Sequence, residues 1–320
     1  FSISKAQEIP SSFADLAEKL MPSVVNISTT TTVTTRSNPL PFEFPPGSPF
    51  EDMFGSPQQR QTSALGSGFI IYEEGIVITN NHVIQGASDI FVRVNGDEDY
   101  KAEVLGADAG MDIAVLKIKS DEKFKPVKFG NSDKSRIGDW VIAIGNPFGL
   151  GGTVTAGIIS ARNRSIGLSR YEDYIQTDAS INQGNSGGPL FNMSGDVIGI
   201  NTAILGQSGS IGIGFAIPSN SAQKVIEQLI EFGETKRGWL GVRIQVVDQG
   251  IADAEKLDKP RGALVASVAD NSPSDKGGIK PGDIILEFDW KPINEMKELP
   301  KIVAETDVGK KVIVKVWRNK

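Results

Sequence analysis

The sequence predicts a mainly β protein with two domains, a β-rich domain over residues 1–235 and a small α+β domain over residues 236–320. Short β-branched runs alternate with glycine or Asn/Asp turns and lack intervening helices, which is typical of antiparallel barrels or a sandwich. The composition then changes near residues 233–237, after which several short strands and one or two short helices fit a separate module. The length of 320 residues also favours two domains.

The amino-terminal elements follow from local patterns. A short helix is expected after Ser12, which can cap it, and Pro22 ends it. A β-rich stretch starts at Val24. The Pro-, Ser-, Gln- and Gly-rich segment over about residues 36–61 predicts a loop of unusual length, and its four phenylalanines suggest that it docks part of the time.

Strands and one helix are expected along the rest of the β-rich domain. The expected strands lie at residues 68–71, 76–79, 90–94, 113–116, 140–144, 153–155, 197–200 and 214–217. A helix is expected over about 220–232, with Gly233 at its end. Its apolar face would consist of Ala222, Val225, Ile226, Leu229 and Ile230.

Composition excludes several classes of function. A net charge of -6 argues against nucleic acid or an anionic membrane as the main partner. No apolar run is long enough to span a bilayer. The absence of cysteine excludes disulfides and thiolate chemistry, and a single histidine cannot build the usual metal sites, so we expect neither metal nor cofactor. Because the chain lacks an initiating Met and a basic-then-apolar leader, we expect that any signal peptide has been removed.

Ser186 lies in the turn Gly-Asn-Ser-Gly-Gly-Pro, which has the local character of an activated nucleophile. A serine hydroxyl needs a base to take its proton, and His82 is the only histidine in the chain. The turn also matches the Gly-x-Ser-x-Gly pattern of α/β-hydrolases, in which a helix follows the serine and the histidine comes later. Neither condition holds here. The chain order that fits is that of a chymotrypsin-like enzyme, in which the histidine comes first, then the aspartate, then the serine.

The acid of this order must lie between His82 and Ser186. We choose Asp112, because it opens an apolar strand where a carboxylate needs a donor. Asp178 is the main rival, although its position more often supports a serine loop. The oxyanion hole is expected in the segment Gly184, Asn185 and Ser186, with the N–H groups of Gly184 and Ser186 as donors. The other candidates are Asp89, Asp97, Asp99, Asp108, Asp121, Asp133, Asp139 and Asp173.

The segments 79–84, 112–116 and 184–190 resemble the three motifs of the HtrA (DegP/DegQ) family of serine proteases. The likeness continues through 145–149 and 214–218 into a carboxy-terminal module that resembles a PDZ domain. The resemblance implies two six-stranded β-barrels, a homotrimer with larger cages, and degradation of unfolded or misfolded envelope proteins in the periplasm, with chaperone activity. The lack of cysteine favours the DegQ branch. A second PDZ domain is typical of these enzymes, so we expect a truncated form.

The substrate pocket is expected to take small aliphatic side chains. Ser180 stands six residues before Ser186, where trypsin-like enzymes that read basic residues carry a carboxylate. We expect the pocket to be lined by Ser180, Ile181, Thr202, Ala203 and Ile204. Asn185 cannot form the ion pair of a cleaved zymogen, which argues against activation by trimming. The segments Arg162–Tyr174 and Gly206–Gly214 are flexible hairpin tips by themselves and resemble the activation loops of the family.

In the carboxy-terminal module, Gly238-Trp239-Leu240-Gly241 resembles the carboxylate-binding loop of PDZ domains, with Arg237 nearby. The strand from Val242 would receive a peptide as an added strand, and Leu299, Ile302 and Val303 would line the facing helix, with Pro300 tolerable only in its first turn. An ordinary turn with a buried tryptophan is the alternative. For the whole chain, the alternative to an endopeptidase is a holdase chaperone or peptide-binding scaffold with a latent protease site.

Overall fold

The computed structural model describes residues 10–35, 58–96, 98–146, 152–167, 171–182, 184–204 and 212–319. The chain separates into two compact units, with the boundary between Glu234 and Thr235. Gly167, Tyr171 and Glu172 group with the second unit. Each unit has its own core, and each is described separately below.

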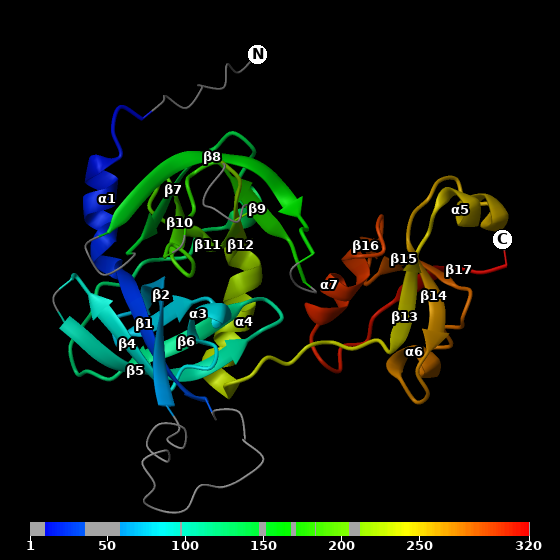
Figure 1. Cartoon of the computed structure of the whole chain (residues 1–320). Helices are drawn as coiled ribbons and strands as arrows, with labels where there is room; N and C mark the ends of the chain where they lie inside the picture. The colour runs from blue at the N-terminus through cyan, green and yellow to red at the C-terminus, as the bar shows by residue number, and fades with distance from the viewer. Residues whose placement is uncertain are drawn as a thin grey trace, which may run out of the picture. The chain divides into compact units, whose positions relative to one another are not determined.

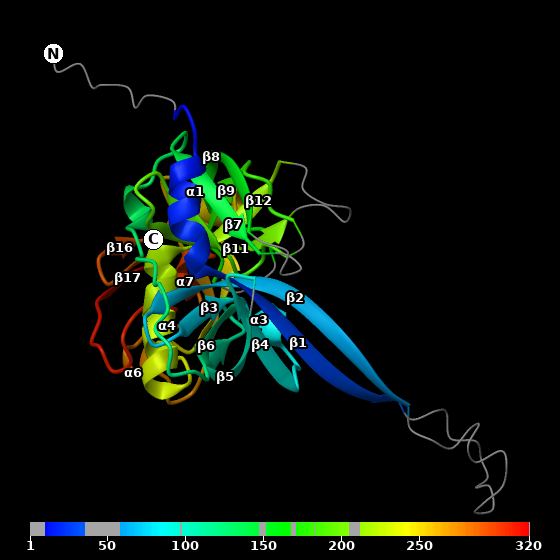
Figure 2. The ribbon, with the colours of Figure 1, turned by 90° about the vertical axis from the view of Figure 1, so that its left-hand side faces the viewer.

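The first unit begins with a closed six-stranded antiparallel barrel in the order β1-β2-β3-β6-β5-β4. Its strands are β1 (Val24–Thr35), β2 (Gln58–Tyr72), β3 (Ile76–Thr79), β4 (Asp89–Val94), β5 (Glu98–Asp108) and β6 (Ile113–Ile118). Figure 2 shows β1 and β2 running on together beyond the barrel as a two-stranded ribbon. Buried aliphatic side chains fill the barrel, among them Ile27, Val77 and Leu116.

A second closed six-stranded barrel follows, in the order β10-β11-β12-β9-β8-β7. Its strands are β7 (Trp140–Gly145), β8 (Thr153–Arg164), β9 (Tyr174–Thr177), β10 (Pro189–Asn192), β11 (Val197–Ile204) and β12 (Gly214–Pro218). The structure therefore confirms a mainly β fold with two barrels, and a sandwich is excluded (Figure 1).

A continuous apolar core joins the two barrels. It combines side chains of the first barrel, such as Phe69, with side chains of the second, such as Phe191, and with one face of helix α4 (Ser219–Phe232). The left-handed Gly233 ends α4, as expected. Ile230, expected on the apolar face, is 37% exposed, because it lies beyond the buried stripe that ends at Leu229.

The short helices of the first unit flank the barrels. They are α1 (Ala14–Leu20), the 3₁₀ turn η1 (Met21–Ser23), α3 (Asn81–Ile84) and the 3₁₀ turn η2 (Ser132–Lys134). Ser12 accepts a hydrogen bond from the N–H of Ala14, but the cap position itself is Phe13. Pro22 lies inside η1. A proline is tolerated at the start of a helical turn, because the N–H that it lacks has no partner within the turn.

The second unit is a five-stranded sheet with short helices. The order is β13-β14-β15-β16, with β17 paired to β15, so β13 forms one edge. The strands are β13 (Val242–Val246), β14 (Ala263–Val268), β15 (Ile284–Phe288), β16 (Lys291–Pro292) and β17 (Val314–Trp317), and the helices are α5 (Gln249–Glu255), α6 (Pro273–Lys276) and α7 (Glu298–Ala304).

The expected elements lie where strands and helices are found. Strands β5, β9 and β10 and the short helix α3 lie outside the expected ranges. Strand β2 begins at Gln58, so the last residues of the expected loop over 36–61 belong to a strand. The rest of that loop, with Phe42, Phe44, Phe50 and Phe54, lies outside the described residues. In the described part of the chain, no helix has the length and apolar character to cross a membrane.

Candidate active site

His82 lies in α3, directly after the end of β3, and its side chain is 47% exposed. Its Nδ1 lies 2.6 Å from Oδ2 of Asp112, and its backbone N–H donates to Oδ1 of the same carboxylate at 2.9 Å. An ionised carboxylate can only accept, so Nδ1 carries the proton of a neutral ring. The other ring nitrogen, Nε2, is then left as a proton acceptor.

Asp112 stands in a left-handed conformation (φ 55°) just before β6, a backbone region that aspartate tolerates better than most residues. The side-chain amide of Asn80 donates to its backbone carbonyl at 2.8 Å. The hydroxyl of Thr202, on β11 of the second barrel, donates to Oδ2 at 2.7 Å. The carboxylate is thus held from both barrels and stays 22% exposed.

Ser186 lies in a turn that packs against the chain segment leading to His82. A Cβ on Gly187 would collide with the carbonyl oxygen of Ser67 and the hydroxyl of Thr79, and Gly187 has a left-handed φ of 84°. Only glycine therefore fits, and the turn can lie directly on the end of β3. The carbonyl of Ser186 accepts from the N–H of Ser67 at 2.9 Å.

Some backbone N–H groups around Ser186 donate hydrogen bonds within the protein, and others do not. The N–H of Asn185 donates to the carbonyl of Asn182 at 3.0 Å, and the N–H of Gly187 donates to the carbonyl of Asn201 at 2.8 Å. Within the described part of the chain, the N–H groups of Gly184 and Ser186 donate to no protein acceptor. Two donors separated by one residue are the arrangement that a developing oxyanion needs.

The residues expected to line the substrate pocket have the following contacts. Ser180 is exposed, and its carbonyl accepts from the hydroxyl of Thr155 at 3.0 Å and from the side-chain amide of Asn185 at 3.4 Å. Ile181 is buried and occupies the space that a side chain on Gly214 would need. The hydroxyl of Thr202 is directed to Asp112, as described above. Ala203 and Ile204 belong to β11, but their side chains lie outside the described residues.

The rival acid Asp178 has a different partner. Its Oδ1 accepts from the N–H of Ile158 on β8 at 2.7 Å. Asp178 therefore fixes the chain just before Ser180 to the second barrel, and the partner of His82 is Asp112. Of the expected activation loops, Arg162–Arg164 belong to β8 and Tyr174 opens β9, while 168–170 and 205–211 lie outside the described residues.

Sequence reasoning missed Ser67 and the contact of Thr202 with Asp112. Ser67 is fully buried, and its hydroxyl donates to the carbonyl of Gly184 at 2.5 Å. The signal in the sequence is weak: Ser67 stands between two glycines in a run of strand residues. Because the hydroxyl of a fully buried serine cannot reach water, it must find its hydrogen-bond partners inside the protein.

The second unit holds a separate cavity of about 410 Å³ beside the loop 238–241. Leu240 is buried and Trp239 is 64% exposed, so the alternative of a turn around a buried tryptophan is wrong. A side chain on Gly238 would collide with the carbonyl of Val303 in α7, which explains the glycine. The cavity is lined by Arg237, Gly238, Trp239, Leu240, Pro273, Phe288, Val303, Thr306, Asp307, Val308, Gly309, Lys310 and Val312.

A strand and a helix are present where the sequence predicts the two sides of the peptide groove. The edge strand β13 begins at Val242, and α7 buries Leu299 and Val303. Pro300 lies in the first turn of α7, where a proline is tolerated. Arg237 donates to the hydroxyl of Thr235 at 2.9 Å, and its guanidinium lies 4.6 Å from the centre of the Tyr171 ring. Those two contacts fix the direction of its side chain.

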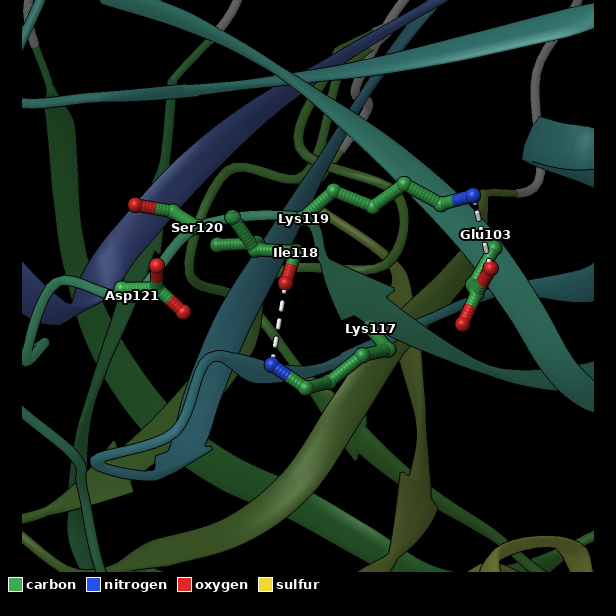
Figure 3. A pocket seen from close by; sticks show the side chains of 6 residues that line it. All are labelled: Glu103, Lys117, Ile118, Lys119, Ser120 and Asp121. Atoms are coloured by element: carbon green, nitrogen blue, oxygen red, sulfur yellow. Dashed lines mark hydrogen bonds and ion pairs between the residues drawn. The ribbon is translucent and has the colours of Figure 1, made fainter.

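A hollow on the first barrel offers no comparable chemistry (Figure 3). Lys119 is paired with Glu103 at 2.8 Å, and Lys117 donates to the carbonyl of Ile118 at 2.9 Å. The hydroxyl of Ser120 accepts a hydrogen bond from the N–H of Glu122, and no histidine lines the hollow. Across the described residues, no three His, Asp or Glu side chains converge to hold a metal ion.

Comparisons with known proteins agree with this geometry. The trypsin-like peptidase domain family matches residues 66–200, and the PDZ domain family matches residues 238–320. A probable periplasmic serine endoprotease DegP-like of Marinomonas sp. (strain MWYL1) is 48% identical, over 96% of this chain and 68% of its own length. The protein of the same name from Brucella suis is 44% identical, over 96% and 66%. The chain thus spans about two thirds of the length of these relatives.

Solved structures give the same result. An HtrA-type protease, AlgW, bound to a decapeptide, superposes with a TM-score of 0.79 at 42% identity, over 96% of this chain and 95% of that one. A serine endoprotease from Yersinia pestis superposes with a TM-score of 0.67 at 35% identity, over 98% and 95%. With both domain families matched in order and relatives at this identity, the chain belongs to the HtrA family of serine endoproteases with a PDZ domain.

Proposed function

We propose that this chain hydrolyses peptide bonds in unfolded or misfolded proteins, without ATP, through an acyl-enzyme. Ser186 is the nucleophile, His82 the general base and Asp112 the acid that orients the imidazole. One observation carries the proposal: the hydrogen-bonded His82–Asp112 pair stands on the segment against which the glycine turn of Ser186 is packed.

The chemistry follows from the protonation pattern of these groups. Nε2 of His82 takes the proton of Ser186 Oγ as that oxygen attacks the carbonyl carbon, and Asp112 stabilises the imidazolium that forms. The N–H groups of Gly184 and Ser186 donate to the oxyanion of the tetrahedral intermediate. The imidazolium then gives its proton to the leaving amine. Water repeats the sequence on the acyl-enzyme and releases the second product.

Small or medium aliphatic side chains, such as Val, Ile or Ala, are the proposed preference of the primary pocket. The position six residues before Ser186 is Ser180, which supplies no charge to hold Lys or Arg, and Ile181 next to it is apolar. A cleavage-site profile of denatured protein tests this. A profile dominated by cleavage after basic residues would contradict it.

The PDZ domain is proposed to bind peptide carboxyl termini. Successive N–H groups of the loop 238–241 would hold the terminal carboxylate, while the peptide pairs with the free edge of β13. The solved HtrA-type protease AlgW is described with a decapeptide and with a tripeptide, which supports peptide binding in this family. Arg237, held at Thr235 and Tyr171, adds positive charge beside the cavity.

Assembly, location and chaperone activity complete the proposal. The relatives are named periplasmic, and we extend that location to this chain, with removal of a signal peptide. The resemblance to DegP and DegQ supports a homotrimer that forms larger cages around clients and protects unfolded proteins. The mass of the assembly with and without denatured casein tests this part. A monomer under both conditions would contradict it.

Casein cleavage tests the central claim. Ser186→Ala should lower kcat by about 10⁵-fold or more, because the nucleophile is removed while the fold is kept. Ser194→Ala, an exposed serine in the turn after β10, is the matched control and should cleave at the wild-type rate. Cleavage that persists in Ser186→Ala would overturn the mechanism. If wild type does not cleave casein but prevents its aggregation, the protein is a holdase instead.

A further inference from the structure

Ser67 stands on β2 of the first barrel but contacts the serine turn of the second. Its backbone N–H donates to the carbonyl of Ser186 at 2.9 Å, and its hydroxyl donates to the carbonyl of Gly184 at 2.5 Å. The two residues whose carbonyls it holds are the two whose N–H groups form the proposed oxyanion hole. Ser67 itself is fully buried, so it has no exposed surface to offer a substrate.

The hydroxyl of Ser67 has one fixed orientation. It accepts a hydrogen bond from the N–H of Asn146 at 2.8 Å, so its single proton is directed at the carbonyl of Gly184. The carbonyl of Ser67 accepts from the hydroxyl of Thr79 at 2.7 Å. Every polar group of this residue is therefore used, and the residue cannot turn to another partner.

The peptide planes of the turn explain what these bonds do. The Gly184–Asn185 plane is held at its carbonyl by Ser67 and at its N–H by Asn182, and the Ser186–Gly187 plane is held by Ser67 and Asn201. Because each peptide is planar, a plane fixed at both ends cannot rotate. The N–H groups of Gly184 and Ser186 lie next to these fixed planes and stay unpaired in the described part of the chain.

Gly184 is the residue of this turn whose backbone can rotate most easily. It has φ 99°, a region open to glycine alone, and glycine rotates between such regions at little cost. Rotation about its two backbone bonds turns its N–H away from the site. We propose that Ser67 is a positioning residue that holds Gly184, and with it the oxyanion hole, in the working conformation from across the barrel interface. This inference rests on the proposed function of Ser186.

The test is Ser67→Ala, with Ser219→Ala as the matched control. Ser219 is equally buried and its hydroxyl donates to the carbonyl of Gly130 at 2.6 Å, at the start of α4 and away from the turn. Rates are measured on a short peptide substrate and divided by the fraction of sites that a fluorophosphonate labels. Removing one oxyanion donor typically costs 10²–10³ in kcat, so Ser67→Ala should lose about 10²-fold in kcat while KM stays within about threefold.

An aldehyde inhibitor separates positioning from general loss of stability. The hemiacetal of a peptide aldehyde places its oxygen in the oxyanion hole, so its inhibition constant should rise in parallel with the loss of kcat/KM. Ser219→Ala should lower the thermal midpoint to a similar extent but leave kcat and the inhibition constant unchanged. Ser67→Cys has a somewhat larger side chain that keeps a weak donor, and should recover part of the loss; it also replaces Ser67→Ala if that variant does not fold.

The outcomes distinguish this inference from the proposed function. If Ser186→Ala is inactive and Ser67→Ala keeps kcat within twofold of wild type, the positioning role is wrong and the nucleophile stands. A loss in Ser67→Ala that matches the loss in Ser219→Ala also overturns it, since any buried serine would then do the same. If Ser186→Ala remains active, the proposed mechanism fails, whatever Ser67→Ala does.

Discussion

At the scale of single residues, removing the hydroxyl of Thr202 tests how the carboxylate of Asp112 is held in place. This hydroxyl donates to the same carboxylate oxygen that His82 contacts. Thr202→Val keeps the shape but removes this donor. A hydrogen bond to a charged group contributes about 1.5–3 kcal/mol, so kcat/KM should fall by roughly 10- to 100-fold. Peptide hydrolysis measures the effect. Thr31→Val, whose hydroxyl bonds to Gly86 on the first barrel, should stay at the wild-type rate, and an unchanged Thr202→Val would show that Asp112 is held without it.

Removal of His82 provides a second test at this scale. No other imidazole exists in the chain to accept the Ser186 proton. The kcat/KM of peptide hydrolysis should therefore fall by about 10⁵-fold or more in His82→Ala, while circular dichroism still reports folded protein. Unchanged hydrolysis in this variant would mean that another group acts as base.

The candidate residues differ in how far sequence alone reveals them. His82 and Ser186 could be predicted because the chemistry needs both and only one histidine exists. Asp112 followed from its place before an apolar strand. The partners that hold these residues could not be predicted, since Ser67 meets Gly184 from 117 positions away and Thr202 meets Asp112 from 90 positions away. Such contacts depend on how two barrels pack, and no local pattern encodes that packing.

At the scale of elements, an ion pair ties the start of β15 to the end of β17. The carboxylate of Asp283 is 1% exposed and contacts Arg318 at 2.6 and 2.7 Å, and the N–H of Lys280 donates to it at 2.7 Å. Burial acts to raise the pKa of Asp283, but the hydrogen bonds and charges of Arg318 and Lys280 together lower the pKa below its usual value.

This lowered pKa has a direct consequence for stability. A carboxyl group whose pKa is depressed by folding stabilises the protein above its unfolded pKa, and the contribution disappears as the pH falls through the folded pKa. The PDZ domain should therefore lose stability in acid below the usual aspartate range. Asp283→Asn should lower the unfolding free energy by about 2 kcal/mol at neutral pH and flatten this dependence.

The measurement is urea unfolding of the full chain followed by tryptophan fluorescence, because Trp239, Trp290 and Trp317 all lie in the second unit. Asp258→Asn is the matched control: its ion pair with Arg261 is solvent-exposed, and such pairs contribute at most about 1 kcal/mol. Equal effects of the two substitutions would contradict a special role for the buried carboxylate.

The elements that sequence patterns failed to predict share a physical cause. Strand β5 is mostly exposed, so its sequence has few of the buried β-branched positions that reveal a strand. Strand β9 is only four residues long. Strand β2 extends back to Gln58 because it pairs with β1 along its whole length, which is a tertiary contact and not a local preference. Helix α4 was predictable because its buried stripe repeats with helical period.

At the scale of the whole molecule, two units with separate cores should carry separable activities. We predict that the Ser186→Ala variant does not hydrolyse peptides but binds a peptide carboxyl terminus with wild-type affinity. Binding is measured by calorimetry with a decapeptide that ends in an aliphatic residue, using Ser186→Ala in the 320-residue chain so that the peptide is not cleaved. The same peptide with a carboxy-terminal amide should bind at least about tenfold more weakly, because it lacks the charge-assisted hydrogen bonds to the loop 238–241. Equal affinity for acid and amide would place the peptide elsewhere on the protein. A large loss of affinity in Ser186→Ala would show that peptide binding depends on the protease site.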